Sequence, residues 1–185
     1  NKGVFTDERD GEIYGWVKIV DQIWMSENLR YQGVLSYTLH PDSSPHGRLY
    51  EYPEALTACP DGWHLPSDAE WAQLELALGM SADEVFLHRT QRGTGQVGHK
   101  LKDPNAWPNL VGTITEPCGF NALPSGHYWP SNNESWLISN GTVFWTSTTA
   151  RLRYAFRREI VNNATIQRRD SYQSQAYSVR CLKVE

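Results

Sequence analysis

The chain has 185 residues, of which 39% are hydrophobic and 21% charged, and its formal net charge is −4. This length suits a single domain with a sizeable core. Because this net charge is negative and is spread without acidic runs, bulk attraction to nucleic acid is not expected. No apolar run approaches the roughly 18 residues that a membrane-spanning helix needs.

The first elements expected along the chain are two strands. Residues 12–20 are rich in β-branched and aromatic side chains and alternate as a half-buried strand does. Asp21 and Gln22 then turn the chain, and residues 23–25 continue as a second strand. We therefore expect a β-hairpin near the N-terminus.

Two helices are predicted next, both in the first half. Residues 52–59 indicate a short helix, because Pro53 suits a first turn and Pro60 ends the pattern. A stronger signal starts at Ser67, which fits a capping box together with Glu70. The buried face and the end of that second helix are indicated by Trp71, Leu74, Leu78 and Gly79.

The second half shows no helical periodicity. Short apolar and aromatic runs alternate there with Gly, Asn, Ser and Pro, which predicts strands joined by long loops, at residues 120–123, 142–147, 154–160 and 176–182. We expect one domain over residues 1–185 with an α+β fold, in which two helices in the first half precede short strands and long loops in the second.

Arginines gather in one part of the chain. Residues 151–170 contain six of them against two acidic residues, Glu159 and Asp170. Two interpretations remain open: exposed strands with Arg at their outward positions, or a patch that faces a ligand. The six are Arg151, Arg153, Arg157, Arg158, Arg168 and Arg169.

The three cysteines, Cys59, Cys118 and Cys181, lie far apart and form no C-x-x-C motif, which excludes the zinc-ribbon and thioredoxin patterns. An odd number leaves at most one disulfide. Their spacing does not choose a pair, and a fully reduced protein is equally acceptable.

Several longer motifs occur in a fixed order. Residues 59–71 read Cys-Pro-Asp-Gly-Trp-His-Leu-Pro-Ser-Asp-Ala-Glu-Trp, residues 119–126 read Gly-Phe-Asn-Ala-Leu-Pro-Ser-Gly, and residues 178–181 read Ser-Val-Arg-Cys. With the opening Trp16-Val-Lys-Ile and Trp24-Met, the chain resembles the Fibrobacter succinogenes major paralogous domain over roughly residues 3–183.

This resemblance implies a fold and a location. The family is similar to the formylglycine-generating-enzyme branch of the C-type lectin fold, so a C-type-lectin-like fold is implied. By the same analogy Cys59 pairs with Cys181 and Cys118 is free. Family members are mostly surface or secreted bacterial proteins, many of them lipoproteins, which implies an extracellular or outer-surface location. The chain starts at Asn1 without a leader, so we expect a signal or lipid anchor to have been removed.

Some relatives of the family serve as variable, receptor-like proteins of diversity-generating retroelements. In those proteins a segment rich in Asn, Tyr, Ser and Arg precedes the closing Ser-Val-Arg-Cys. Residues 148–177 have this composition. The resemblance therefore suggests the hypothesis that they form a variable ligand-binding segment.

Most catalytic and cofactor patterns are excluded. Residues 93–98 match the dinucleotide fingerprint in letters, but no βαβ unit surrounds them. Formylglycine-generating oxidases use a cysteine pair near the C-terminus, where this chain has only Cys181, and its six histidines lack the spacing of metal ligands. We expect no catalytic residue and no metal ligand.

Calcium is treated separately because some lectins hold it with a Glu-Pro-Asn loop. Glu116-Pro117-Cys118 resembles that loop, but the cysteine supplies no oxygen, so calcium is not expected there. Calcium held elsewhere by backbone carbonyls stays open. No other cofactor is expected.

We therefore expect a non-enzymatic, extracytoplasmic module that recognises or adheres to a glycan or protein on another surface. Aromatic rings supply contact area at little entropic cost, and Arg adds forked hydrogen bonds. Trp63 and Trp145 are assigned to the core. The alternatives are a structural subunit of a cell-envelope assembly and a formylglycine-generating-enzyme-like oxidoreductase. Candidate ligand contacts are Trp129, Trp136, Arg151, Arg153, Tyr154, Phe156 and Tyr172.

Overall fold

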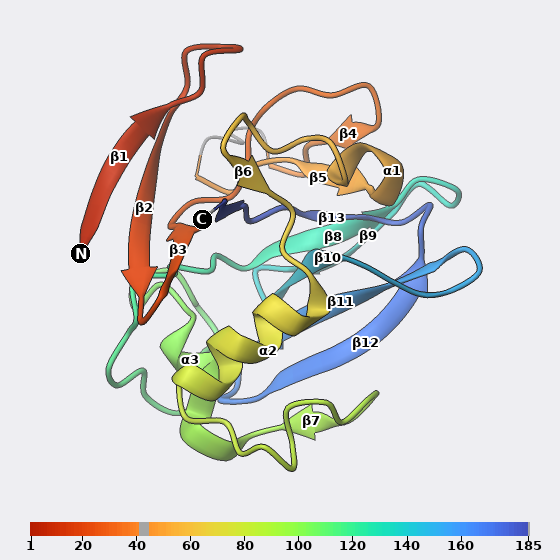
Figure 1. The fold of residues 1–185 in the computed structure, drawn as a ribbon. Coiled ribbons are helices and arrows are strands. Elements are labelled where there is room, and N and C mark those ends of the chain that lie inside the picture. The colour runs from red at the N-terminus through yellow and green to blue at the C-terminus, as the bar shows by residue number, and fades with distance from the viewer. Residues whose placement is uncertain (41–44, 185) are drawn as a thin grey trace.

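The computed structural model describes residues 1–40 and 45–184, and two β-sheets make up most of it (Figure 1). The smaller sheet joins the two ends of the chain, because the C-terminal strand pairs with the N-terminal hairpin. Its strands, in spatial order, are β1 (Lys2–Thr6), β2 (Ile13–Ile19), β3 (Gln22–Met25), β14 (Leu182–Lys183) and β6 (Trp63–His64).

The larger sheet carries most of the second half of the chain. Its long antiparallel strands β10 and β11 form a hairpin, and β12 pairs with β11. The strands in spatial order are β4 (Ser36–Tyr37), β5 (Leu49–Glu51), β13 (Ala176–Ser178), β8 (Ser125–Trp129), β10 (Gly141–Arg151), β11 (Tyr154–Val161), β12 (Ile166–Tyr172) and β7 (Gln91–Arg92), while β9 (Glu134–Ile138) pairs with β8.

The expectation of an α+β, C-type-lectin-like fold with two helices in its first half is wrong. The described chain is mostly β-sheet, and its helices are α1 (Tyr52–Ala55), α2 (Asp68–Ala77), α3 (Val97–Lys100) and a 3₁₀ turn, η1 (Thr94–Gln96). The helix expected over residues 52–59 ends after one turn, since Cys59 is tied into a disulfide and Pro60 follows. Most of the regular structure is instead β-strand, to which aromatic and β-branched residues are well suited.

The second predicted helix start is confirmed in atomic detail. The Ser67 hydroxyl accepts from the Glu70 backbone N–H at 3.2 Å, and the Glu70 carboxylate accepts from the Ser67 N–H at 2.6 Å. These two bonds satisfy N–H groups that the first turn of α2 leaves without partners. Gly79, with φ of +102°, follows the helix in the left-handed conformation that glycine tolerates best.

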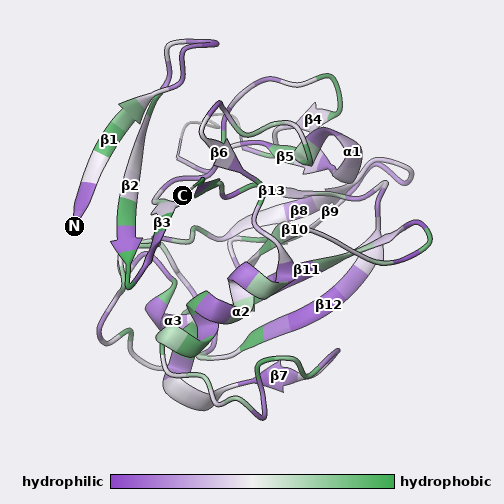
Figure 2. Ribbon diagram, viewed as in Figure 1, coloured by the Kyte–Doolittle hydropathy of each residue, from purple (hydrophilic) through white to green (hydrophobic). Residues whose placement is uncertain are grey.

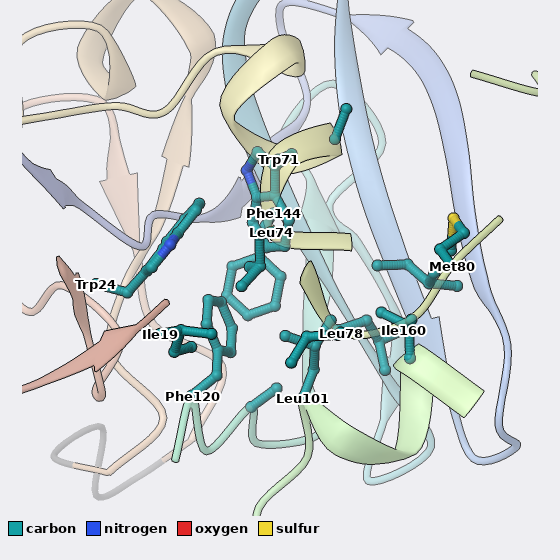
Figure 3. Packing of buried hydrophobic residues seen from close by; sticks show 14 of the residues in the cluster. Ile19, Trp24, Trp71, Leu74, Leu78, Met80, Leu101, Phe120, Phe144 and Ile160 are labelled. Carbon is teal, nitrogen blue, oxygen red and sulfur yellow. The ribbon is translucent and has the colours of Figure 1, made fainter. Parts of the chain in front are cut away.

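One aromatic cluster joins α2 to both sheets (Figure 3). The ring of Trp71 on α2 lies 5.1 Å from Trp24 of the smaller sheet and 5.7 Å from Phe144 of the larger one, measured between centroids. Phe120 packs between them and is fully buried. Aromatic packing of this kind adds about 0.5–1.5 kcal/mol per pair beyond the area buried. A second cluster contains Trp145, which is fully buried as expected, with Trp63 packed partly buried against it.

Ion pairs rather than apolar contacts hold the other side of α2 to the larger sheet. Glu75 of α2 accepts from Arg92 and Arg158 at 2.7 Å, and all three side chains are fully buried. Asp68, the first residue of the same helix, accepts from Arg158 at 2.7 Å and from Arg168 at 2.8 Å. Figure 2 accordingly shows β12, which carries Arg168, as hydrophilic over most of its length.

The carboxylates of this network keep the guanidinium groups charged. Burial opposes the charge on Arg158, but Glu75 and Asp68 outweigh it and raise its pKa. Burial likewise opposes ionisation of Asp68, yet Arg168 and Arg158 lower its pKa. Each of the three guanidinium groups in the network thus contacts a carboxylate, as buried charges require, and Glu75 is shared by Arg92 and Arg158.

The disulfide that the resemblance implied is present between Cys59 and Cys181, whose Cα atoms lie 5.9 Å apart, and Cys118 is free. It links the segment after α1 to the C-terminal strand across 122 residues of sequence. Within the described residues no helix combines the length and hydrophobicity needed to cross a membrane.

Lys102 is a buried amine outside the ion network. Its Nζ donates to the backbone oxygens of Gly98 at 2.8 Å and Asn163 at 2.7 Å, and it lies 4.8 Å from the ring centroid of Trp107. Burial lowers the pKa of Lys102 to about 7. A neutral amine has two N–H groups, which match the two carbonyl acceptors.

The first prediction concerns the disulfide. Closing so long a loop restricts the unfolded chain, so replacing Cys59 and Cys181 together by Ala should lower the free energy of unfolding by about 4–5 kcal/mol. Urea unfolding under non-reducing conditions measures this. Cys118→Ser is the matched control and should have little effect; equal loss in both variants would contradict the assignment.

The second prediction concerns the ion network. Glu75→Gln leaves two fully buried guanidinium groups short of a carboxylate, so the free energy of unfolding should fall by about 3–5 kcal/mol. The matched control is Glu116→Gln, whose side chain is 81% exposed and which should change stability little. A small effect of Glu75→Gln would show that the network does not anchor α2.

The third prediction is the pH dependence caused by Lys102. The folded pKa of about 7 lies below the ordinary 10.5, so the unfolded chain binds the proton more tightly between these values. The contribution of Lys102 to stability therefore rises with pH across that range, by about 1.4 kcal/mol per pH unit in its middle.

Lys102→Met should remove this slope, which comparison with the parent by urea unfolding at pH 6, 7.5 and 9 would show. Both proteins should carry Cys118→Ser to prevent disulfide exchange at high pH. The exposed Lys18→Met serves as control. Parallel pH profiles for parent and Lys102→Met would refute the lowered pKa.

Candidate functional site

An aromatic cavity opens where four strands of the larger sheet meet. We call it the aromatic basin and define it by Trp129 of β8, Arg157 of β11, Arg169 of β12 and Tyr177 of β13. Its volume is about 220 Å³. The residues that reach it are Trp129, Tyr154, Arg157, Arg169, Asp170, Ser171, Tyr172, Gln175 and Tyr177.

The β8–β9 hairpin positions the tryptophans. Asn133, with φ of +54°, turns the chain so that Trp129 pairs with Glu134 and His127 pairs with Trp136. Residues two apart on a strand share a face, so the indoles of Trp129 and Trp136 become diagonal neighbours with centroids 5.7 Å apart. Trp136 is 50% exposed and supports Trp129 by this ring contact without lining the basin itself.

The floor of the basin is buried and polar as well as aromatic. Arg157 donates to the Ser171 hydroxyl at 2.6 Å and to the Glu159 carboxylate at 2.5 Å, and its guanidinium carbon lies 5.4 Å from the Tyr177 ring centroid. Burial, reinforced by Arg157, lowers the pKa of His127 to about 4. His127 is therefore uncharged at neutral pH.

Arg169 lies directly opposite Arg157 in the β11–β12 register. Its guanidinium donates to the Gln167 side-chain oxygen at 3.4 Å, and no carboxylate lies within 4.0 Å of it in the described part of the chain. The basin thus contains one guanidinium that Glu159 neutralises and one that lacks an acidic partner.

Strand alternation places other arginines of the same segment on the opposite face. Arg158 and Arg168 point to α2, where Asp68 and Glu75 bind them. The six arginines of residues 151–169 consequently form neither a row of exposed outward positions nor one continuous ligand patch. The arginines of this segment are instead divided between the two faces of one sheet.

The tyrosines expected to bind ligand form a pair at the end of the sheet. Tyr154 and Tyr172 are cross-strand neighbours with ring centroids 4.3 Å apart, and the Arg151 guanidinium stacks 4.0 Å above Tyr154. Arg151 also contacts Asp170 at 3.2 Å, and Asp170 accepts from Arg89 at 2.8 Å. Burial opposes ionisation of Asp170, but Arg89 lowers its pKa.

This tyrosine pair also lines the basin. Phe156, two residues from Tyr154 on the same strand, lies 3.9 Å from the Arg168 guanidinium, which in turn binds Asp68 of α2. Arg153 occupies the tip of the β10–β11 hairpin and lines a separate groove with Tyr172. Of the seven expected contacts, Trp129, Tyr154 and Tyr172 therefore line the basin, while Trp136 packs against Trp129.

Several basin residues were not expected from the sequence. Tyr177 precedes the Ser-Val-Arg-Cys motif and resembles a core residue, while Arg157 and Arg169 were part of an undivided arginine cluster. Their odd positions along β11 and β12 were the available signal, because alternate residues on a strand share a face. This signal could be used only once the bounds of β11 and β12 and their pairing register were known.

A second hollow of about 460 Å³ lies between the smaller sheet and α2. It contains His64, which bonds the Glu70 carboxylate at 2.8 Å, and Gln22, which donates to the Glu70 backbone oxygen at 3.0 Å and to Gln73 at 3.2 Å. These groups bind one another and tie β3 to α2. Because these contacts hold the smaller sheet to α2, we assign the hollow a structural role.

No group of three or more His, Cys, Asp or Glu residues is placed to hold a metal within residues 1–40 and 45–184. The free Cys118 is partly buried, and burial raises the pKa of its thiol, which keeps it protonated and weakly reactive. Glu116 beside it has a left-handed backbone and contacts Lys100 at 3.7 Å.

Comparison with known proteins gives one family match. The model of the Fibrobacter succinogenes major domain matches residues 17–183, a span that includes every residue of the basin and both disulfide cysteines. No curated protein and no solved structure matches the chain.

Proposed function

We propose that this chain, which belongs to the Fibrobacter succinogenes major domain family, is a non-enzymatic binding module that holds part of a glycan or protein ligand in the aromatic basin. The observation that carries the proposal is the meeting of Trp129, Tyr177, Arg157 and Arg169 around one open cavity. Concave sites with aromatic walls and a few polar groups are the usual form of binding sites.

The basin is built to bind without large rearrangement. Trp129 and Trp136 support each other by ring contact, and Arg157 is fixed by Ser171 and Glu159. Side chains already held in one conformation lose little entropy when a ligand arrives. Rigid aromatic anchors beside forked guanidinium donors are common among residues that dominate binding energy.

The disulfide supports an extracytoplasmic location. Disulfides such as Cys59–Cys181 persist in oxidising compartments and are rare in the cytosol. An outer-surface or secreted position follows as part of the proposal. A glycan or protein on another surface is then the natural ligand.

The variable-receptor idea stays a hypothesis about differences between gene copies. The segment concerned, residues 148–177, supplies Arg157, Arg169 and the tyrosine pair to the basin, and Arg158 and Arg168 to the α2 face. Substitutions in it would therefore alter two separate surfaces. The arginines that bind α2 would have to be spared.

The fourth prediction tests which surface binds. In a glycan and surface-protein array followed by calorimetry, Trp129→Ala combined with Trp136→Ala should weaken capture at least tenfold, because aromatic side chains that dominate a binding site contribute about 2 kcal/mol or more each. The melting temperature should change little, since Trp129 is partly exposed and Trp136 is half exposed.

The comparison variant removes an exposed aromatic ring outside the basin, Phe86→Ala, which packs against Arg168 on the α2 face, and it should retain capture. Loss of capture in the Phe86 variant alone would move the site to the α2 face. Recovery of the chain only within a stable envelope complex, with no array ligand, would favour a structural subunit instead. Stoichiometric copper or iron in the purified protein would favour an oxidoreductase.

A further inference from the structure

We propose that the aromatic basin recognises an acidic sugar, a pyranose ring bearing a carboxylate, and that Arg169 binds the carboxylate. The inference deepens the proposed binding function and rests on it. It names the chemical class of the ligand. It also proposes that Arg169 makes the protein bind acidic rings more tightly than neutral ones.

The charge balance of the larger sheet differs between its two faces. On the α2 face, Arg158 and Arg168 lie directly opposite each other, and two buried carboxylates of α2, Asp68 and Glu75, contact them. Like charges in directly opposed positions repel and need such compensation. On this face each of the two arginines contacts a carboxylate, although Glu75 is shared with Arg92.

On the basin face the compensation is incomplete. Arg157 and Arg169 are opposed in the same register, and Glu159 contacts Arg157 alone. Arg169 has no carboxylate within 4.0 Å among the described residues, and its closest polar contact is a neutral amide at 3.4 Å. His127, uncharged at neutral pH, adds no positive charge to compete for an anion. A ligand carboxylate beside Arg169 would give this arginine the acidic partner that Arg158 and Arg168 have on the other face.

The shape and walls of the basin favour a sugar ring as the carrier of that anion. A volume of about 220 Å³ is below the roughly 300–1,000 Å³ of sites for drug-sized ligands, so one ring or one side chain fits. Trp129 offers an apolar wall, while Ser171 and Gln175 offer hydroxyl and amide partners for ring hydroxyls. Arg matches a carboxylate with two parallel N–H bonds.

The experiment titrates the full chain by calorimetry with D-galacturonate and D-glucuronate. D-galactose and D-glucose provide the same rings without the carboxylate, and acetate provides a carboxylate without the ring. The acidic sugars should bind at least tenfold more tightly than either control, because a charge-assisted hydrogen bond contributes about 1.5–3 kcal/mol. The difference should shrink at high salt.

Variants assign the effect to one residue. Arg169→Gln should bring the affinity for galacturonate down to that for galactose, Arg169→Lys should keep part of the difference, and Lys18→Gln, which removes the same charge from the smaller sheet, should leave it intact. Circular dichroism and melting curves verify folding, and the Lys variant keeps the test informative if the Gln variant unfolds.

The proposal is overturned if neutral sugars bind as tightly as acidic ones, if Arg169→Gln keeps the discrimination, or if neither acidic sugar binds. None of these results tests the binding function itself, which the variant lacking Trp129 and Trp136 tests separately. Loss of array capture on removing Trp129 and Trp136, with Arg169→Gln unaffected, would uphold the module and refute the acidic ligand.

Discussion

The buried ion pairs between α2 and the larger sheet are the constraint on which the rest depends. Glu75 and Asp68 face three guanidinium groups, and each buried charge would be costly without the others. Satisfying them fixes the rotation of α2 and its position over β11 and β12. Because successive side chains alternate, the same contacts determine which residues of those strands face away from the helix.

That alternation links stability to the proposed function. Arg158 and Arg168 stabilise the α2 face, while their neighbours Arg157 and Arg169 reach the aromatic basin. A shift of β12 by one residue would exchange Arg168 and Arg169 between the two faces, which would leave Asp68 without one of its arginines and change the basin. The register is therefore held by the charges as well as by the backbone hydrogen bonds.

The disulfide fixes the C-terminal strand of the chain. Cys181 lies next to β14, which is paired with both β3 and β6, so the bond holds the C-terminal strand between two early segments. Val179 and Tyr177, upstream on the same stretch, are buried in the second core cluster. Tyr177 is thereby fixed as the floor of the basin, and a covalent link far from the cavity helps to keep its shape.

Local signals in the sequence determined the helix start at Ser67 and the N-terminal hairpin, because capping bonds and strand alternation act over a few residues. The family resemblance supplied the pair Cys59 and Cys181, which spacing could not choose. The mostly β architecture, the burial of Arg158, and the meeting of Tyr154 and Trp129 at one cavity were decided only by tertiary structure. Each depends on pairing between distant strands, and the side-chain pattern of one strand does not reveal which face its partner will cover.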